Sequence, residues 1–150
     1  MKWLGWTLLA VLALGCRRVP PAELAQSVEV LSVSLAFPKA DQGELFFEVA
    51  LPLNVPRVGA LRWELYLGAK RFAEGVAMNP ELGTTAGGRR FLRVEAPLVF
   101  HHLGWREGGT WLSVGLRGEL QPLGGDQRYS FQRRTEQLVT AAPVLDESGE

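Results

Sequence analysis

Apolar and polar residues alternate through the segment from Glu44 to Arg57. Its apolar residues fall at every second position and are Leu45, Phe47, Val49, Leu51 and Leu53, with Glu44 and Glu48 between them. Because successive side chains of a strand point to opposite faces, this spacing predicts a core strand with one apolar side. Pro56 cannot donate to a sheet ladder, so we expect the strand to end at residues 54–56.

Six further segments have the same period of two, and none shows the period of a long helix. The expected strands are residues 28–37, 60–68, 71–78, 89–100, 110–120 and 127–138. Stretches rich in Gly, Pro, Asn and Asp, which are typical of turns, separate them, and residues 79–88 are expected to form the longest loop. Seven short strands with such turns predict an all-β fold, an antiparallel sandwich of two sheets.

Single positions refine this picture. Trp63 lies in the clearest alternating segment and is expected in the core. Tyr129 and Phe131 share one face of the last strand. Gly115 and Gly118 interrupt an apolar strand, where a missing side chain is typical of close packing or of a bulge.

The composition fits one folded domain. A chain of 150 residues with 47% hydrophobic and 21% charged residues can form a core and has an ordinary charge content. Its 16 basic residues balance 16 acidic ones, so no long-range field favours nucleic acid as a partner. The single cysteine excludes an internal disulfide, so packing alone must hold the fold.

The amino terminus has the pattern of a signal peptide. Met1 and Lys2 give a short positive start, and residues 3–15 are uncharged and mostly apolar. A helix over this segment would rise roughly 20 Å, which is less than the roughly 30 Å hydrocarbon core of a bilayer. This length is more typical of the hydrophobic region of a signal peptide than of a permanent span.

The next residues, Ala13-Leu14-Gly15-Cys16, resemble the lipobox of bacterial lipoproteins. The resemblance implies that Cys16 receives a diacylglycerol, and palmitate among its acyl chains, and that cleavage makes it the first residue. Arg17 in place of an Asp is compatible with sorting to the outer membrane of the bacterial envelope, facing the periplasm. Arg17 and Arg18 could also rest on anionic headgroups. The alternative is a chance thiol after an ordinary signal or anchor helix.

These patterns divide the chain into four parts. Residues 1–15 are the expected signal peptide, and residues 16–27 the lipidated cysteine with a Pro-containing tether. Residues 28–138 form the sandwich, and residues 139–150 an acidic tail that we expect to be loose.

Small and apolar residues also recur in a characteristic order between residues 28 and 135. A strand ends near Asn54, the next reaches Gly68, Phe72-Ala73-Glu74-Gly75 follows, and a later strand carries Val114-Gly115-Leu116-Arg117-Gly118. Together these features resemble the LEA type 2 family, also called the water stress and hypersensitive response domain. That family commonly has Asn and Pro adjacent, whereas Val55 intervenes here. The resemblance implies a fibronectin type III or immunoglobulin-like sandwich that is not an enzyme and is linked to desiccation and stress tolerance.

The candidates for chemistry are weak, and we expect no metal, no cofactor and no catalysis. His101 and His102 are adjacent and would point in different directions, and only Glu107 lies nearby as a further ligand. Ser113 lacks the glycine two positions before it that a nucleophile elbow requires. Glu44 and Glu48 lie on one strand face, where two carboxylates could serve in glycoside cleavage, but charges on such a face are ordinary in a half-exposed sheet. Ser32 and Ser34 are likewise interpreted as a polar strand face.

The aromatic residues Phe100, Trp105 and Trp111 flank a segment without strand pattern. They are a candidate contact surface, because exposed aromatic side chains often anchor partners. The alternative is that they cap the end of the sandwich.

Three functions therefore stay open. The first is a membrane-anchored, non-catalytic envelope lipoprotein that protects or contacts envelope components under desiccation or osmotic stress. The second is a carrier of lipid or of a small hydrophobic ligand. The third is an assembly subunit that pairs through a sheet edge.

Overall fold

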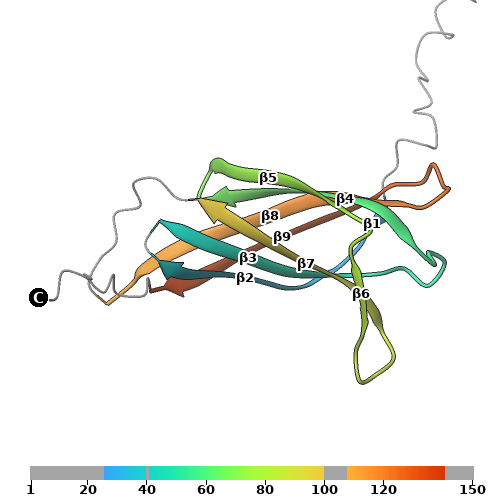
Figure 1. Ribbon diagram of the computed structural model, residues 1–150, viewed down its shortest axis with the longest axis horizontal. Helices are drawn as coiled ribbons and strands as arrows, with labels where there is room; N and C mark the ends of the chain where they lie inside the picture. The colour runs from blue at the N-terminus through green and yellow to red at the C-terminus, as the bar shows by residue number, and fades with distance from the viewer. Residues whose placement is uncertain (1–25, 40, 100–107, 141–150) are drawn as a thin grey trace, which may run out of the picture.

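The computed structural model describes residues 26–39, 41–99 and 108–140. These residues form a sandwich of two sheets, which Figure 1 shows as two layers along the long axis of the molecule. The strands are β1 (Gln26–Ser27), β2 (Val30–Lys39), β3 (Gln42–Ala50), β4 (Val58–Leu67), β5 (Lys70–Met78), β6 (Glu81–Thr84), β7 (Arg90–Val99), β8 (Thr110–Pro122) and β9 (Tyr129–Val139). The predicted fold class is thus confirmed.

The strand order is that of an immunoglobulin-like sandwich. One sheet has the order β2-β3-β7-β6 and the other the order β1-β9-β8-β4-β5. Apart from the two-residue β1 and the additional strand β5, this is the arrangement in which strands A, B, E and D face strands C, F and G. The pairings are antiparallel, except that β1 runs parallel to β9.

All seven predicted strands are present, but the segment from Glu44 to Arg57 ends earlier than its alternation suggests. Strand β3 stops at Ala50, and the side chain of Leu53 is 94% exposed although it was expected in the core. Pro52 has no amide hydrogen for a ladder, and the chain turns there, with the amide of Val55 donating to the Pro52 carbonyl at 3.1 Å. The prediction for Leu53 was therefore wrong.

Two short strands lie where none was expected. Strand β6 falls within the predicted loop 79–88 and pairs with Arg90–Arg93 of β7. The ring of Phe91 lies over Gly83, where a Cβ atom would come within 2.3 Å of it. Strand β1 takes up the last two residues of the predicted tether and pairs with Tyr129 and Ser130. Segments this short show no alternation that could be recognised in the sequence.

The centre of the core is an aromatic cluster. Phe47 contacts Trp63 edge-on with ring centroids 6.3 Å apart, and it contacts Phe131 at 6.0 Å. Both partner rings lie over glycines of the neighbouring strands, Trp63 over Gly75 and Phe131 over Gly118. The four residues form one row across the sheet, in which a large ring alternates with a missing side chain. Trp63 is 6% exposed, so the prediction that it belongs to the core is confirmed.

The sandwich is closed on one side by polar side chains. Gln137 of β9 donates from Nε2 to the Val33 carbonyl at 2.7 Å, and its Oε1 accepts from the Leu35 amide at 3.1 Å. Arg133 donates to the carbonyls of Val30 and Leu31, both at 2.9 Å. The outer edge of β2 is thereby satisfied by side chains of the other sheet rather than by a further strand.

Candidate functional site

The opposite side of the sandwich is a groove between strand edges. It has a volume of about 480 Å³ and is lined by Phe72–Ala77 of β5 and Val94–Val99 of β7, with Trp63 between them. Within the described part of the chain, β5 pairs only with β4, and β6 covers β7 only as far as Arg93. In the described residues, Ala73–Ala77 of β5 and Val94–Val99 of β7 thus have a ladder partner on one side only, which leaves an edge that a further strand could use.

Two features limit strand pairing along this groove. Pro97 lies in β7, where it has no amide hydrogen to offer. Glu74 and Glu95 are exposed charged residues on its two edges. Charges and proline on an edge strand are the usual means of preventing uncontrolled pairing.

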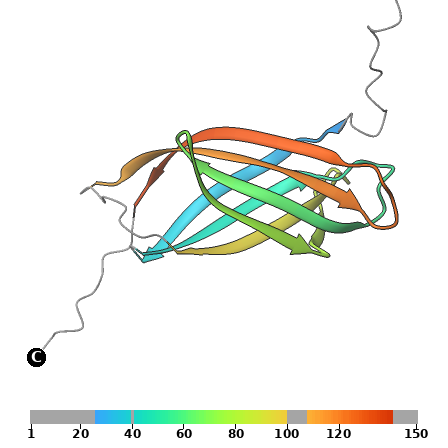
Figure 2. The same ribbon diagram turned by 90° about the horizontal axis from the view of Figure 1, so that it is seen from above.

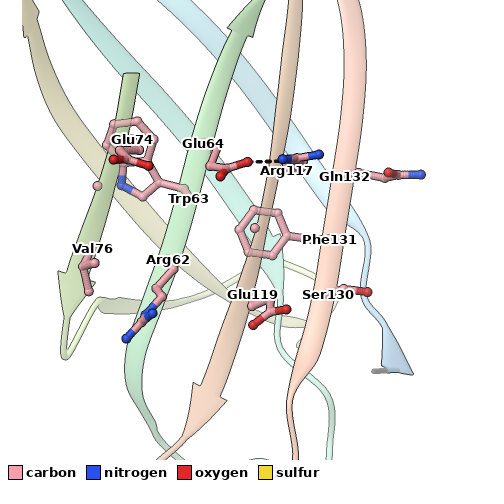
Figure 3. Close-up of a pocket in the computed structure, with 12 residues that line it drawn as sticks. Arg62, Trp63, Glu64, Glu74, Val76, Arg117, Glu119, Ser130, Phe131 and Gln132 are labelled. Carbon is pink, nitrogen blue, oxygen red and sulfur yellow. Dashed lines mark hydrogen bonds and ion pairs between the residues drawn. The ribbon is translucent and has the colours of Figure 1, made fainter. Parts of the chain in front are cut away.

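A second hollow lies on the outer face of the five-stranded sheet (Figure 3). Its volume is about 650 Å³, and the row of Gly75, Trp63, Gly118 and Phe131 runs beneath it. The charged residues around it are Arg62, Glu64, Glu74, Arg117 and Glu119. These side chains alternate with the core residues of β4, β5 and β8, so the strand period itself brings them to one face.

Glu64 is the centre of a charged network on this face. Its carboxylate accepts hydrogen bonds from Arg117, which Figure 3 shows as a dashed line, from the Tyr66 hydroxyl at 2.9 Å and from Arg71 at 3.5 Å. The Arg117 guanidinium also lies 4.8 Å from the centroid of the Tyr66 ring. Three donors thus converge on Glu64 and a cation–π contact on Tyr66, both in β4, while the two arginines come from the neighbouring strands β5 and β8.

The network keeps Glu64 ionised. The hydrogen bond from Arg117, followed by that from Tyr66, lowers the pKa of the Glu64 carboxyl below its ordinary value of 4.5. The same bond to Glu64 raises the pKa of Arg117. Burial, followed by the hydrogen bond to Glu64, raises the pKa of the Tyr66 hydroxyl. A general acid at neutral pH needs a raised carboxyl pKa, so this network is suited to holding the sheet rather than to proton transfer.

Two of the three serines considered for catalysis are engaged elsewhere. The Ser32 hydroxyl donates to Glu48 at 3.3 Å, and the Ser113 hydroxyl accepts from Arg134 at 3.3 Å. Ser34 is exposed on β2. Neither histidine of the chain belongs to the described residues, so no serine is placed against an imidazole base there.

The carboxylates considered for glycoside cleavage are not brought together. Glu44 and Glu48 lie four positions apart on β3, which corresponds to about 13 Å along a strand, whereas the two carboxyl groups of a glycosidase lie roughly 5–9.5 Å apart. Glu48 forms an ion pair with Arg93 at 2.9 Å. The described residues also contain no group of three or more His, Cys, Asp or Glu that could hold a metal ion.

Of the candidate contact surface, only Trp111 is described; Phe100 and Trp105 lie outside the described residues. The side chain of Trp111 is 69% exposed, and its neighbour across the strand pair, Leu138, is 50% exposed. Together they form an apolar pair at the beginning of β8. This exposure agrees better with a contact surface than with a cap on the core.

The sequence alone did not predict two features: the Glu64–Arg117 pair and the groove between β5 and β7. The pairing of Glu64 with Arg117 depends on the register of β4 against β8, which no local pattern reveals. The groove between β5 and β7 depends on where β6 stops. The only available signal was that Glu64 and Arg117 occupy polar positions of alternating strands.

The residues of the lipobox-like motif, Ala13, Leu14, Gly15 and Cys16, lie outside the described part of the chain, as do His101, His102 and the acidic tail. In the part that is described, no helix has the length and apolar character needed to cross a membrane. Comparison of the chain with protein-family models, with curated proteins and with solved structures gave no match.

Proposed function

We propose that the chain is a lipid-anchored, non-catalytic lipoprotein of the bacterial envelope. The observation that carries the proposal is the sequence Ala13-Leu14-Gly15-Cys16 directly after an apolar segment of signal-peptide length. The first described strand begins at Gln26, so only a short tether separates the acylated cysteine from the sandwich. Two or three acyl chains, each CH₂ contributing about 0.8 kcal/mol when buried, would hold the protein on a membrane permanently.

The character of the sandwich supports a protective or binding role of the LEA type 2 kind. The space between the sheets is filled at its centre by Phe47, Trp63 and Phe131. The outer faces carry ion pairs such as Arg93 with Glu48 and Arg117 with Glu64. A filled core with charged faces is suited to contact with envelope components, and it disfavours a carrier that would hold its ligand between the sheets.

Metabolic labelling with palmitate tests the anchor. We expect the wild type to incorporate the label and to sediment with membranes, and Cys16→Ser to lose the label. Ala13→Leu is the matched control, because Leu is commoner at this position of a lipobox and labelling should persist. Label in Cys16→Ser, or none in the wild type, would refute the anchoring.

Survival after drying and rehydration tests the protective role. We expect a deletion strain to survive less well than its parent and to be restored by the wild-type gene. Cys16→Ser should restore survival poorly, because protection requires the sandwich at the envelope. Equal survival of parent and deletion strain under both drying and osmotic shock would contradict this role.

The groove between β5 and β7 favours a second candidate, an assembly subunit that pairs through a sheet edge. Among the described residues, Ala73–Ala77 of β5 have ladder partners only in β4, and Val94–Val99 of β7 have them only in β3, so the two walls are edges of different sheets. Cross-linking in intact cells should then recover a dimer or a larger assembly. Val76→Lys adds a charge to the β5 edge and should reduce the cross-linked species, whereas Ser34→Lys on β2, whose edge is already satisfied, should not. Recovery of monomer alone would exclude this candidate.

A further inference from the structure

The end of the sandwich at which β1 begins carries two exposed leucines. Leu53 is 94% exposed in the loop between β3 and β4, and Leu123 is 60% exposed in the loop between β8 and β9. Figures 1 and 2 show both loops at the same end of the molecule, on the right in each view. The loops also touch, because the Leu123 amide donates to the Arg57 carbonyl at 3.0 Å.

The loop of Leu53 is held in place rather than loose. Arg90 donates from Nη2 to the carbonyls of Pro52 at 3.1 Å and Val55 at 2.8 Å. Leu51 and Val55 are buried on either side, being 5% and 2% exposed. The fold therefore fixes the loop that presents the exposed Leu53 side chain at this end of the sandwich.

The charge of this end is positive. Residues 26–29, 51–57, 84–90 and 122–129 contain four arginines and two carboxylates, Glu29 and Asp126, and Glu119 adds a third carboxylate beside Arg128. Arg89 is paired with Glu29 at 2.7 Å and Arg90 is engaged with the loop carbonyls. Arg57 and Arg128 are both exposed; Arg128 lies 3.7 Å from Glu119, and Arg57 has no ion-pair partner among the described residues.

The chain that leads to Cys16 leaves from the same end. Strand β1 is fixed against Tyr129 and Ser130, directly after the loop that contains Leu123. Residues 17–25 can span at most about 30 Å when fully extended. A lipidated Cys16 would thus keep this end, rather than the end with Trp111, close to the bilayer.

We propose that this end docks on an anionic phospholipid surface, an inference that rests on the lipid anchor of the proposed function. Leu53 and Leu123 enter the interface between headgroups and acyl chains, and Arg57 and Arg128 contact the phosphates. Two leucines are too small a surface for a stable protein interface, which buries about 800 Å² on each partner. They suffice where an anchor already holds the protein at the membrane, because docking then needs little affinity of its own.

Amide hydrogen exchange on the purified full-length lipoprotein tests the docking. The protein is reconstituted in vesicles of phosphatidylcholine with phosphatidylglycerol and, separately, of phosphatidylcholine alone. We expect amides of residues 51–57 and 123–128 to exchange about tenfold more slowly in the anionic vesicles, with no change near Trp111. Equal rates in the two vesicles would overturn the proposal.

Variants separate docking from anchoring. The double variant Leu53→Ser with Leu123→Ser should abolish the slowing of amide exchange in anionic vesicles. The double variant Arg57→Glu with Arg128→Glu should abolish it too, with both leucines in place. Both variants should still incorporate palmitate. Trp111→Ser with Leu138→Ser is the matched control at the far end and should leave the slowing intact. Slowing that persists in both test variants would overturn the docking while leaving the anchor standing; absence of palmitate from the wild type would overturn both.

Discussion

At the scale of single residues, the core depends on positions where no side chain can stand. A Cβ atom on Gly118 would come within 2.1 Å of the Arg62 carbonyl oxygen and 2.4 Å of the Phe131 ring. The first of these neighbours is backbone of the adjacent strand, so it cannot rotate away. In the row beneath the outer hollow, the packing of the rings therefore requires glycine at the alternate positions, where even alanine would clash.

Gly118→Ala should consequently destabilise the fold although it adds a single methyl group. We expect a loss of about 1–3 kcal/mol in the free energy of unfolding, measured by urea denaturation. Gly87→Ala is the matched control, since the nearest atom to its Cβ would be the Thr85 hydroxyl at 3.9 Å; its effect should stay within about 0.5 kcal/mol. Equal stability of the two variants would contradict the proposed packing.

The charged network around Glu64 should make the stability of the fold depend on pH in the acid range. Because the pKa of Glu64 is lowered on folding, its contribution to stability is present above its ordinary pKa of 4.5 and is lost as the pH falls toward the lowered pKa. We expect the urea midpoint of the wild type to fall more steeply over that acid range than that of Glu64→Gln. Tyr66→Phe removes one of the donors to Glu64. The fall of its urea midpoint with pH should lie between that of the wild type and that of Glu64→Gln.

The source of this pH dependence is tested by a double-mutant cycle. In an Arg117→Gln background, which lacks the largest cause of the lowered pKa, Glu64→Gln should change the acid slope much less. An undiminished effect would mean that the slope arises elsewhere.

At the scale of elements, the two sheets are joined along one side by the side chains of β9. Gln137 satisfies a carbonyl and an amide of β2 that have no strand partner. Gln137→Leu leaves both groups unpaired and should cost about 1–3 kcal/mol of unfolding free energy, together with faster exchange of the Leu35 amide. Gln132→Leu, on the exposed face of the same strand, serves as the control and should change neither.

The sequence predicts some of these strands and misses others, for a physical reason. Strands with one buried face, such as β4 with Leu61 and Leu65, were recognisable because burial imposes a period of two. Leu53 continues that period past Pro52, so alternation alone could not show that the ladder ends. Strand β6 is defined by its pairing with β7 and not by its own residues. The Glu64 network and the β5–β7 groove likewise arise from register, which a single sequence does not contain.

At the scale of the whole molecule, we expect the unfolding free energy of the sandwich to be independent of the proposed lipid anchor. Among the described residues, the buried core begins at Val30, and the partly buried Val28 is the first that packs against it. The described residues include no cysteine, so no disulfide contributes to their packing. The proposed lipid anchor would decide where the sandwich is located, whereas the packing of the two sheets decides whether it is folded.

Removal of the anchor should therefore change location without changing stability. We expect Cys16→Ser and the lipidated wild type, unfolded by urea in the same neutral detergent, to agree within about 0.5 kcal/mol in unfolding free energy. Neutral detergent removes the anionic surface, so that docking of Leu53 and Leu123 does not stabilise the wild type in this comparison. A clearly less stable Cys16→Ser would show that the chain before Gln26 packs on the sandwich. The tether would then be part of the fold, and the end that carries the leucines would be covered by the protein itself rather than by lipid.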